Sequence, residues 1–187
     1  GEIFYLQKRI GQYSRPFSII KFATMVKNSP NIGAKDITLQ NDSRVLPFGR
    51  LLRKTKLNEF PQFINVFIGN MSIVGPRPLV NNQYQMIPKQ YIKKISLLKP
   101  GITGIGSIIF RDEERFLNNL ESDSNIFYKN KIVPFKSQLE LWYFNNKSIL
   151  NNIIIIILTV LSIIKPNNKF FNNIFTSIPK HSLFNPD

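Results

Sequence analysis

The sequence contains no cysteine and a single histidine, His181, which stands close to the end of the chain. Without cysteine the chain can form neither a disulfide nor a thiolate metal site. One histidine also makes a histidine-based catalytic triad or zinc cluster implausible. Any catalysis must therefore use carboxylates together with a hard cation.

Acidic residues are scarce as well, because 11 of them stand against 25 lysines and arginines, which gives a formal net charge of +14. This excess indicates a polyanionic partner, such as a nucleic acid, an anionic membrane surface or a phosphorylated substrate. We expect no nucleic acid, because the basic residues cluster before one predicted helix and do not follow an aromatic platform.

The sequence also lacks an apolar run of the roughly 20 residues that span a bilayer. The nearest run, residues 153–164, is 12 residues long and includes Thr159 and Ser162. This length favours a buried helix or strand, with an interfacial membrane segment as the alternative. The chain begins at Gly1 without a methionine or a signal-peptide pattern, so we expect the natural start to lie upstream.

Residues 50–78 carry the most informative pattern. Apolar side chains recur there at the spacing of one helical face, which predicts a helix with a buried stripe made of Phe60, Phe63, Ile64, Phe67 and Ile68. Gly69 is its expected end. Pro61 is tolerated only in a first turn, so the helix should begin near Asn58 and place Asn58 and Glu59 at its N-terminus.

An anion site is expected at this helix start. Free N–H groups and a partial positive charge meet there with the basic residues that come just before it, Arg50, Arg53, Lys54 and Lys56. Downstream, Pro76 and Pro78 stiffen a loop that holds Arg77 ready for a phosphate. The sequence therefore predicts a phosphate as the ligand.

The flanking segments are less specific. We expect two strands joined by a turn within the first 26 residues, followed by a loop over residues 27–41. Asp42 would serve as a cap or as a site residue. Residues 91–99 predict a helix with a lysine face, which is either an interfacial membrane helix or an ordinary surface helix.

Two further stretches have alternative interpretations. Gly101 and Gly104 would allow a backbone to approach a ligand closely, or would serve only in turns. Residues 111–115, which begin with Arg111 and Asp112, form the densest acidic cluster. They are either a solvated helix start or a site that binds a cation or steers phosphate.

The expected fold class is α+β. We expect a small sheet formed by the first thirty residues and residues 71–74, surrounded by several helices, some of them amphipathic and lying on a membrane face. Residues 1–150 would form the main domain, and residues 151–187 an apolar segment with a polar tail.

The sequence resembles the monotopic polyprenyl-phosphate phosphoglycosyl transferases, a group of bacterial sugar transferases. The resemblance runs from about residue 1 to residue 115 and is carried by residues 7–11, 21–25, 42–44, 49–55, 57–62, 65–66, 71–78 and 100–104. It implies transfer of a sugar 1-phosphate from a UDP-sugar to polyprenyl (undecaprenyl) phosphate, with magnesium, release of UMP and a covalent intermediate. This reaction would initiate surface polysaccharide or glycoconjugate assembly.

The resemblance also assigns roles to residues. It implies that Glu59 binds Mg²⁺ and that phosphate or substrate is bound by Arg50, Arg53, Lys54, Arg77 and Arg111. Pro76, Pro78, Gly101 and Gly104 would form the structural loops at the site. The implied location is the cytoplasmic face of the inner membrane, where the protein would be monotopic and could be oligomeric. The family's N-terminal re-entrant helix is not found before Gly1.

Asn58 departs from the family pattern, which has an Asp-Glu pair where this chain has Asn58 and Glu59. A neutral amide is a poor nucleophile, although Asn is a good N-cap for the predicted helix. Either Glu59 or another carboxylate such as Asp112 attacks, or the lipid phosphate attacks directly, or the protein is a scaffold that binds nucleotide-sugar or lipid phosphate without catalysis.

Overall fold

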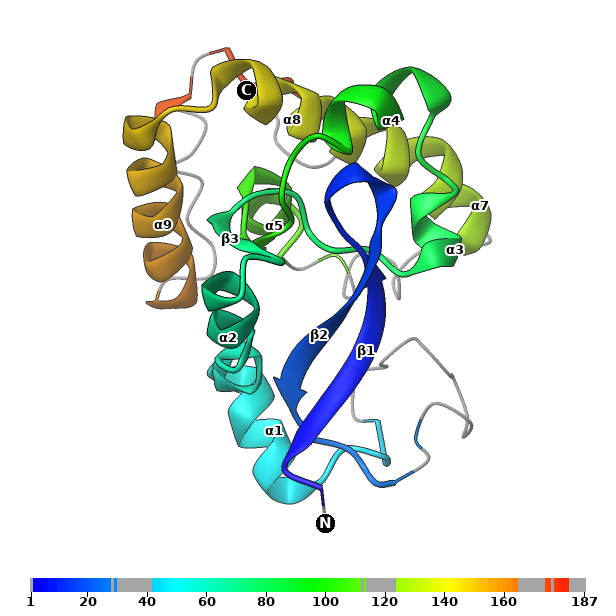
Figure 1. Cartoon of the computed structure of the whole chain (residues 1–187), viewed down its shortest axis with the longest axis vertical. Helices are drawn as coiled ribbons and strands as arrows, with labels where there is room; N and C mark the ends of the chain where they lie inside the picture. Colours follow the sequence, from blue (N-terminus) through cyan, green and yellow to red (C-terminus); the bar gives the residue numbers. More distant parts are fainter. Residues whose placement is uncertain are drawn as a thin grey trace.

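An antiparallel hairpin begins the fold. The computed structural model describes residues 2–27, 29, 42–111, 113, 124–164, 174–175 and 177–181. Strand β1 (Phe4–Ile10) pairs with β2 (Pro16–Phe22), so that Phe4 lies opposite Phe22 and Ile10 opposite Pro16 (Figure 1). This confirms the two strands joined by a turn. Because side chains alternate along a strand, Lys21 shares the face of β2 on which Ile19 is buried.

The helix predicted from Asn58 begins later and is shorter than expected, and it buries the face opposite to the predicted one. Helix α1 (Pro47–Lys54) leads into the 3-10 turn η3 (Leu57–Glu59), and α2 (Gln62–Phe67) starts only after Pro61. Lys56 has a left-handed backbone, φ 62°, which separates η3 from α1. Asn58 therefore lies inside η3 and caps no helix, contrary to the N-cap interpretation.

The predicted buried stripe of α2 is also wrong, because its apolar side chains are exposed, Phe67 to 93%. The buried side chains are the polar ones, Gln62 and Asn65. The Asn65 amide donates to Ser18 O at 2.8 Å and accepts from Ile20 N at 2.9 Å. The open edge of β2 needs hydrogen-bond partners, so the polar face of α2 turns inward to supply them.

The strands form two small sheets and not the single sheet that was expected. Strand β3 (Ser72–Val74) pairs in parallel with β4 (Gly101–Thr103), apart from the β1–β2 hairpin. A Cβ atom built on Gly101 would lie 2.2 Å from Gly75 N, and one on Gly104 would lie 2.2 Å from Gly75 O. These glycines thus permit close packing of two backbone segments. The mixture of helices and small sheets agrees with the expected class.

Helix α4 (Lys89–Ile95) follows α3 (Asn81–Tyr84) and packs on α8 (Val133–Asn146). Its apolar residue Ile95 joins Ile87 and Val133 in a small buried cluster, while Lys89, Lys93 and Lys94 stay exposed. The buried position of Ile95 agrees with the ordinary surface helix, and the interfacial membrane helix stays the alternative interpretation of residues 91–99.

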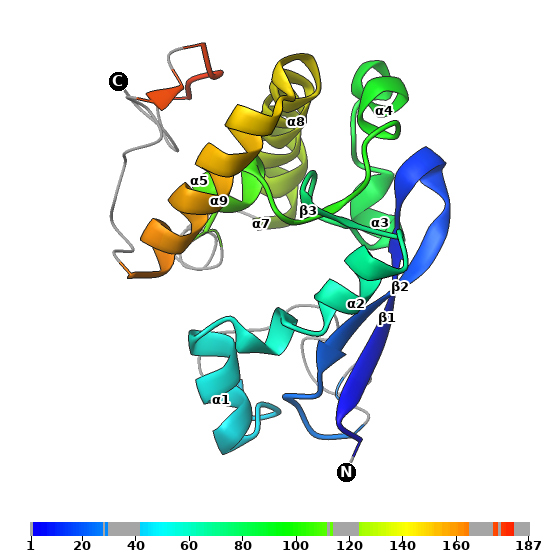
Figure 2. The same ribbon diagram turned by 60° about the vertical axis from the view of Figure 1, so that its left-hand side comes forward.

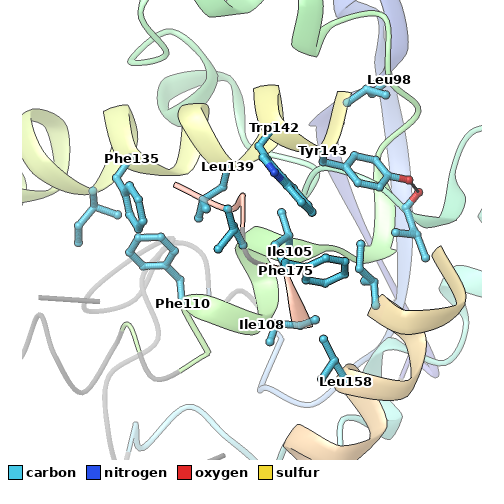
Figure 3. Close-up of a cluster of buried hydrophobic side chains, with 14 residues drawn as sticks. Leu98, Ile105, Ile108, Phe110, Phe135, Leu139, Trp142, Tyr143, Leu158 and Phe175 are labelled. Atoms are coloured by element: carbon cyan, nitrogen blue, oxygen red, sulfur yellow. Dashed lines mark hydrogen bonds between the residues drawn. The ribbon is translucent and has the colours of Figure 1, made fainter. Parts of the chain in front are cut away.

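The main hydrophobic core lies between α5 (Ile105–Ile109), α8 (Val133–Asn146) and α9 (Ile149–Ile164). Figure 3 shows Ile105 of α5 beneath Trp142 of α8, and Ile108 on the other side of α5, close to Leu158 of α9. The segment α7 (Ser124–Phe127) runs through a π-helical turn, η4 (Tyr128–Ile132), into α8. Helix α9 buries Ile155 and Leu158 in this core, as expected for a buried segment, but exposes much of its remaining apolar surface.

Among the helices of the described ranges, none combines the length and apolar character needed to cross a membrane. In Figure 1, α9, α2 and α1 follow one another along the same side of the molecule, and Figure 2 shows that side turned towards the viewer.

Candidate functional site

A cavity of about 460 Å³ lies where the separate parts of the fold meet. Its walls come from η3 and α2, from the loop after β3, and from α5, α8 and α9. It is lined by four of the predicted site residues besides Pro76, namely Lys56, Glu59, Arg77 and Arg111. A smaller pocket shares Glu59 and Arg77 with the cavity and adds Pro78 and Gly101. Tertiary folding therefore brings these predicted residues together.

Lys21 and Glu59 form an ion pair at the smaller pocket, which Lys21 also lines. The Lys21 ammonium lies 3.7 Å from the Glu59 carboxylate, and the two side chains are 17% and 18% exposed. Lys21 comes from β2 and Glu59 from η3, so the packing of these two elements makes the pair. Arg77 acts electrostatically on both groups.

The charge of each group depends on this packing. Burial raises the pKa of Glu59, but the positive charges of Lys21, Arg77 and Lys56 outweigh it, so the net pKa lies below the usual value. Burial lowers the pKa of Lys21 to about 8, and the neighbouring arginines add to that effect. Glu59 is therefore ionised at neutral pH, and Lys21 loses its proton in mildly alkaline solution.

The loop that carries Arg77 is held at several points. Gly101 N donates to Pro76 O at 2.9 Å, and the Arg9 guanidinium donates to Pro78 O at 3.3 Å. The Tyr143 hydroxyl donates to Val74 O at 3.2 Å just before the loop. These bonds fix the backbone on both sides of Arg77, which limits the entropy that a bound phosphate would cost.

The basic residues of α1 lie at different distances from the site. Arg53 donates from Nε to Thr24 Oγ1 at 2.9 Å and also lowers the pKa of Lys21. Arg50 and Lys54 are exposed on α1, and neither is among the described residues that line the cavity. The predicted cluster of basic residues at one helix start is thus divided between the site and the surface.

Asn58 has an unusual environment. Its Oδ1 is buried and has no hydrogen-bond partner within the described part of the protein.

Asp42 is the other residue whose role the sequence left open. Its carboxylate bonds to the buried Arg44 side chain at 2.6 Å and accepts from Arg44 N at 3.0 Å, so it stabilises a turn before α1. Asp112 lies outside the described residues.

A second polar cluster lines the same cavity. Lys136 donates to both oxygens of Glu113 at 2.7 Å and lies over the Phe110 ring at 4.9 Å. Glu140, one helical turn after Lys136 on α8, has its pKa raised by burial to about 8. Burial, together with the Glu113 charge, also raises the pKa of Tyr128.

Sequence reasoning did not select Lys21, Lys136 or Glu140 as site residues. In the sequence, the only feature that pointed to Lys21 was its position as a cation on the apolar face of a predicted strand. The signal for Lys136 and Glu140 was an (i, i+4) pair of opposite charges within an aromatic segment, a spacing that also occurs on ordinary solvated helices. Neither signal points to a cavity without the fold.

A candidate magnesium ligand is present at the cavity. Across the described ranges, no group of three or more acidic or histidine side chains is placed to hold a metal ion. Mg²⁺ commonly binds through one or two carboxylates together with substrate phosphates and water. The ionised Glu59 carboxylate fits this mode, since it is a hard oxygen donor at a cavity lined by Arg77.

The sequence model of one family, the bacterial sugar transferases, matches residues 1–166. The chain belongs to the bacterial sugar transferase family. The match confirms the resemblance and extends it past residue 115, because it includes α8 with Lys136 and Glu140. In this sugar transferase, Glu59, Arg77 and Glu140 thus all lie within the family domain.

Several curated relatives carry informative names. The undecaprenyl-phosphate galactose phosphotransferase of Salmonella typhimurium is 28% identical over 187 residues, which cover 91% of this sugar transferase and 35% of the relative. The UDP-glucose:undecaprenyl-phosphate glucose-1-phosphate transferase of Xanthomonas campestris is 32% identical, covering 88% and 32%. The Escherichia coli protein of that name is 41% identical, covering 65% and 26%. The chain spans about a quarter to a third of the length of these relatives.

Proposed function

We propose that this sugar transferase moves a sugar 1-phosphate from a UDP-sugar to a polyprenyl phosphate such as undecaprenyl phosphate, which initiates the assembly of an exopolysaccharide or another surface glycan. The observation that carries the proposal is the ionised Glu59 beside Lys21 and Arg77 at the smaller pocket, which shares Glu59 and Arg77 with the cavity. The names of the relatives support both substrates.

The reaction exchanges one phosphorus–oxygen bond for another. An oxygen of the lipid phosphate becomes bonded to the β-phosphorus of the UDP-sugar, and the bond from that phosphorus to the bridging oxygen breaks. UMP leaves with the bridging oxygen. Lys21 and Arg77 bind the phosphate oxygens and offset their charge, the main contribution that a protein makes to phosphoryl transfer. The braced loop keeps Arg77 in place during this exchange.

Magnesium is part of the proposal. When bound, Mg²⁺ supplies Lewis-acid polarisation of the phosphoryl oxygens. Glu59 would hold it together with substrate oxygens. Lys21 lies 3.7 Å from the same carboxylate and keeps Glu59 ionised and ready for a cation.

Asn58 leaves two routes to the product. In one route a carboxylate, either Glu59 or another such as Asp112, attacks the β-phosphorus, displaces UMP and forms an acyl phosphate that carries the sugar. In the other route the lipid phosphate attacks directly. Incubation with UDP-sugar and Mg²⁺ but without lipid separates them. The first route releases up to one UMP per protein molecule, whereas the second releases none until polyprenyl phosphate is added.

We also propose that the protein is monotopic and lies on the anionic cytoplasmic face of the inner membrane, where a polyprenyl phosphate is accessible. Helices α1, α2 and α9 lie along one side of the molecule (Figure 1), and each has exposed apolar side chains, among them Phe48, Phe67 and Ile157. An apolar surface on a chain with net charge +14 fits an interfacial protein that is attracted to anionic lipid.

The test is UMP release by the protein in phospholipid vesicles with polyprenyl phosphate, Mg²⁺ and a panel of UDP-sugars. Native protein should turn over at least one of them, and Glu59→Gln should abolish turnover. Glu2→Gln is the matched control, because Glu2 is an exposed carboxylate paired only loosely with Lys27 at 3.8 Å.

A second outcome would support the scaffold alternative. If native protein binds UDP-sugar without turnover and Asn58→Asp restores UMP release, the amide has switched off the chemistry and binding is the function. If neither protein binds UDP-sugar, the proposed function is wrong.

A further inference from the structure

The cavity holds more polar groups than a diphosphate requires. Besides Glu59 and Arg77 it is lined by the second polar cluster, Arg111, Glu113, Lys136 and Glu140, in which Arg111 follows α5 and Lys136 and Glu140 lie on α8. Lys136 is already paired with Glu113, and Glu140 is either neutral or, when ionised, repels a phosphate. The cluster is therefore poorly suited to bind the anionic part of a substrate.

Glu140 lacks the partners that a buried carboxyl group needs. Its side chain is only 9% exposed, and its Oε2 has no hydrogen-bond partner among the residues that the structure describes. The nearest cation on its own helix, Lys136, donates to both oxygens of Glu113. Buried polar groups are normally paired, and an unpaired one is costly, so this atom is a place where a ligand group is missing.

A glycine makes room for this carboxyl group. A Cβ atom built on Gly106 of α5 would lie 2.6 Å from Glu140 Oε1. The bare backbone of Gly106 thus allows the Glu140 side chain to extend across the space between α8 and α5 beside the cavity.

Arg111 has the complementary defect. Its Nη1 is buried and is likewise without an acceptor in the described structure. One cavity therefore offers an unpaired guanidinium donor and an unpaired carboxyl oxygen. An isoprenoid chain could satisfy neither, whereas the hydroxyl groups of a hexose both donate and accept.

We propose that Glu140 and Arg111 bind hydroxyl groups of the hexose ring of the nucleotide sugar, so that the second polar cluster is the sugar-binding part of the cavity. This inference rests on the proposed function, which supplies the nucleotide sugar. The raised pKa of Glu140 supports it, because a neutral carboxyl group both donates to one hydroxyl and accepts from another.

The experiment compares equilibrium dissociation constants of UDP-sugars with that of UDP, using the full chain in vesicles with Mg²⁺. Glu140→Leu removes hydrogen bonding while keeping an apolar side chain of similar length. It should weaken the UDP-sugar used by the protein about tenfold and leave UDP unchanged within about twofold, since only the sugar loses its partner. Glu140→Gln should recover part of the lost affinity.

Two further variants keep the result interpretable. Gln138→Leu makes the same kind of change on the exposed face of α8 and should alter neither constant. Gly106→Ala leaves the chemistry of Glu140 intact but displaces its carboxyl group, so it should reproduce the selective loss even if Glu140→Leu fails to fold.

The outcomes are distinguishable. Equal losses for UDP and UDP-sugar, or no loss for either ligand in Glu140→Leu and Gly106→Ala, would overturn the sugar-binding role while leaving the transferase proposal standing. Failure of native protein to bind UDP would remove the proposed function and this inference with it.

Discussion

Lys21 and Glu59 come from distant parts of the chain and meet at 3.7 Å, so the charge of each depends on the other. Glu59 stays ionised over the physiological range. Lys21 titrates near pH 8, because burial lowers its pKa and the arginines around it oppose a further positive charge. The charge states of Lys21 and Glu59 therefore determine how strongly the site attracts phosphate.

We predict that UDP binding weakens as the pH rises through about 8. The neutral amine that forms there cannot offset phosphate charge, and the expected loss of affinity is about tenfold, or about 1.4 kcal/mol. The dissociation constant should be measured by titration calorimetry from pH 7 to pH 9.5. Lys21→Arg keeps its charge throughout, so its dissociation constant for UDP should not change over this range. If the variant showed the same pH dependence as the native protein, the assignment to Lys21 would be contradicted.

We predict that the buried Glu140 makes the protein less stable as the pH rises. Its pKa rises from 4.5 to about 8 on folding, since burial disfavours the carboxylate and Lys136 compensates only in part. The folded state therefore binds the extra proton between these values, and its contribution to stability decreases as the pH rises from about 4.5 to about 8.

The expected decrease in the free energy of unfolding over that interval is on the order of a few kcal/mol. Urea denaturation at pH 5, 6.5 and 8 would measure it. Glu140→Gln cannot ionise and should lose this pH dependence, while Glu2→Gln, with an exposed carboxyl group removed, should keep it. Identical slopes in native protein and Glu140→Gln would show that Glu140 is not buried as described.

At the scale of elements, α2 shows how a neighbour decides which face of a helix is buried. Asn65 points into the protein because β2 has backbone groups that require partners, and the buried Gln62 side chain hydrogen-bonds to Glu59. The apolar residues are left on the outside. An amphipathic pattern therefore identified the two faces of α2 correctly but assigned them to the wrong environments.

We predict that Asn65→Leu, although it places an apolar residue at a fully buried position, destabilises the protein by about 2–4 kcal/mol, because Ser18 O and Ile20 N both lose their partner. Phe67→Asn makes the reverse change on the exposed face and should shift the free energy of unfolding by less than about 0.5 kcal/mol. Urea denaturation of both variants checks this, and the opposite ranking would mean that α2 buries its apolar face.

At the scale of the whole molecule, α1, α2 and α9 lie along one side and each has exposed apolar side chains, and the chain has a net charge of +14. These two properties favour attachment to an anionic lipid surface. The apolar contribution to binding should persist at high salt. The electrostatic contribution should weaken, because added salt shortens the Debye length and screens the attraction.

We predict that Phe67→Asn lowers retention on vesicles containing phosphatidylglycerol by about tenfold, since an exposed phenylalanine is worth roughly 2 kcal/mol when buried. Sedimentation with vesicles at two salt concentrations measures the effect. Ile126→Asn on α7 is the control, because it also removes an exposed apolar side chain but lies on a different element. Equal losses in the two variants would contradict a specific membrane-facing side.

Much of the candidate site could be predicted from the sequence. Glu59 and Arg77 stand in short motifs whose local stereochemistry is decided by nearby prolines and turns, and both line the cavity. Arg50 and Lys54 were grouped with them by their proximity in sequence and by the family resemblance, and α1 keeps both exposed. Lys21 and Glu140 could not be selected, because their roles come from contacts with residues far along the chain.

The sequence by itself determined the hairpin, the mixed α+β class and the family, because alternation, turn residues and ordered motifs are local properties of the chain. Only the tertiary structure decided that α2 turns its polar face inward, that β3 and β4 form their own sheet, and that Lys21 joins Glu59 while Glu140 enters the same cavity. Burial and charge at these positions depend on which elements pack together, and that packing is set by the hydrogen bonds and apolar surface of the whole chain.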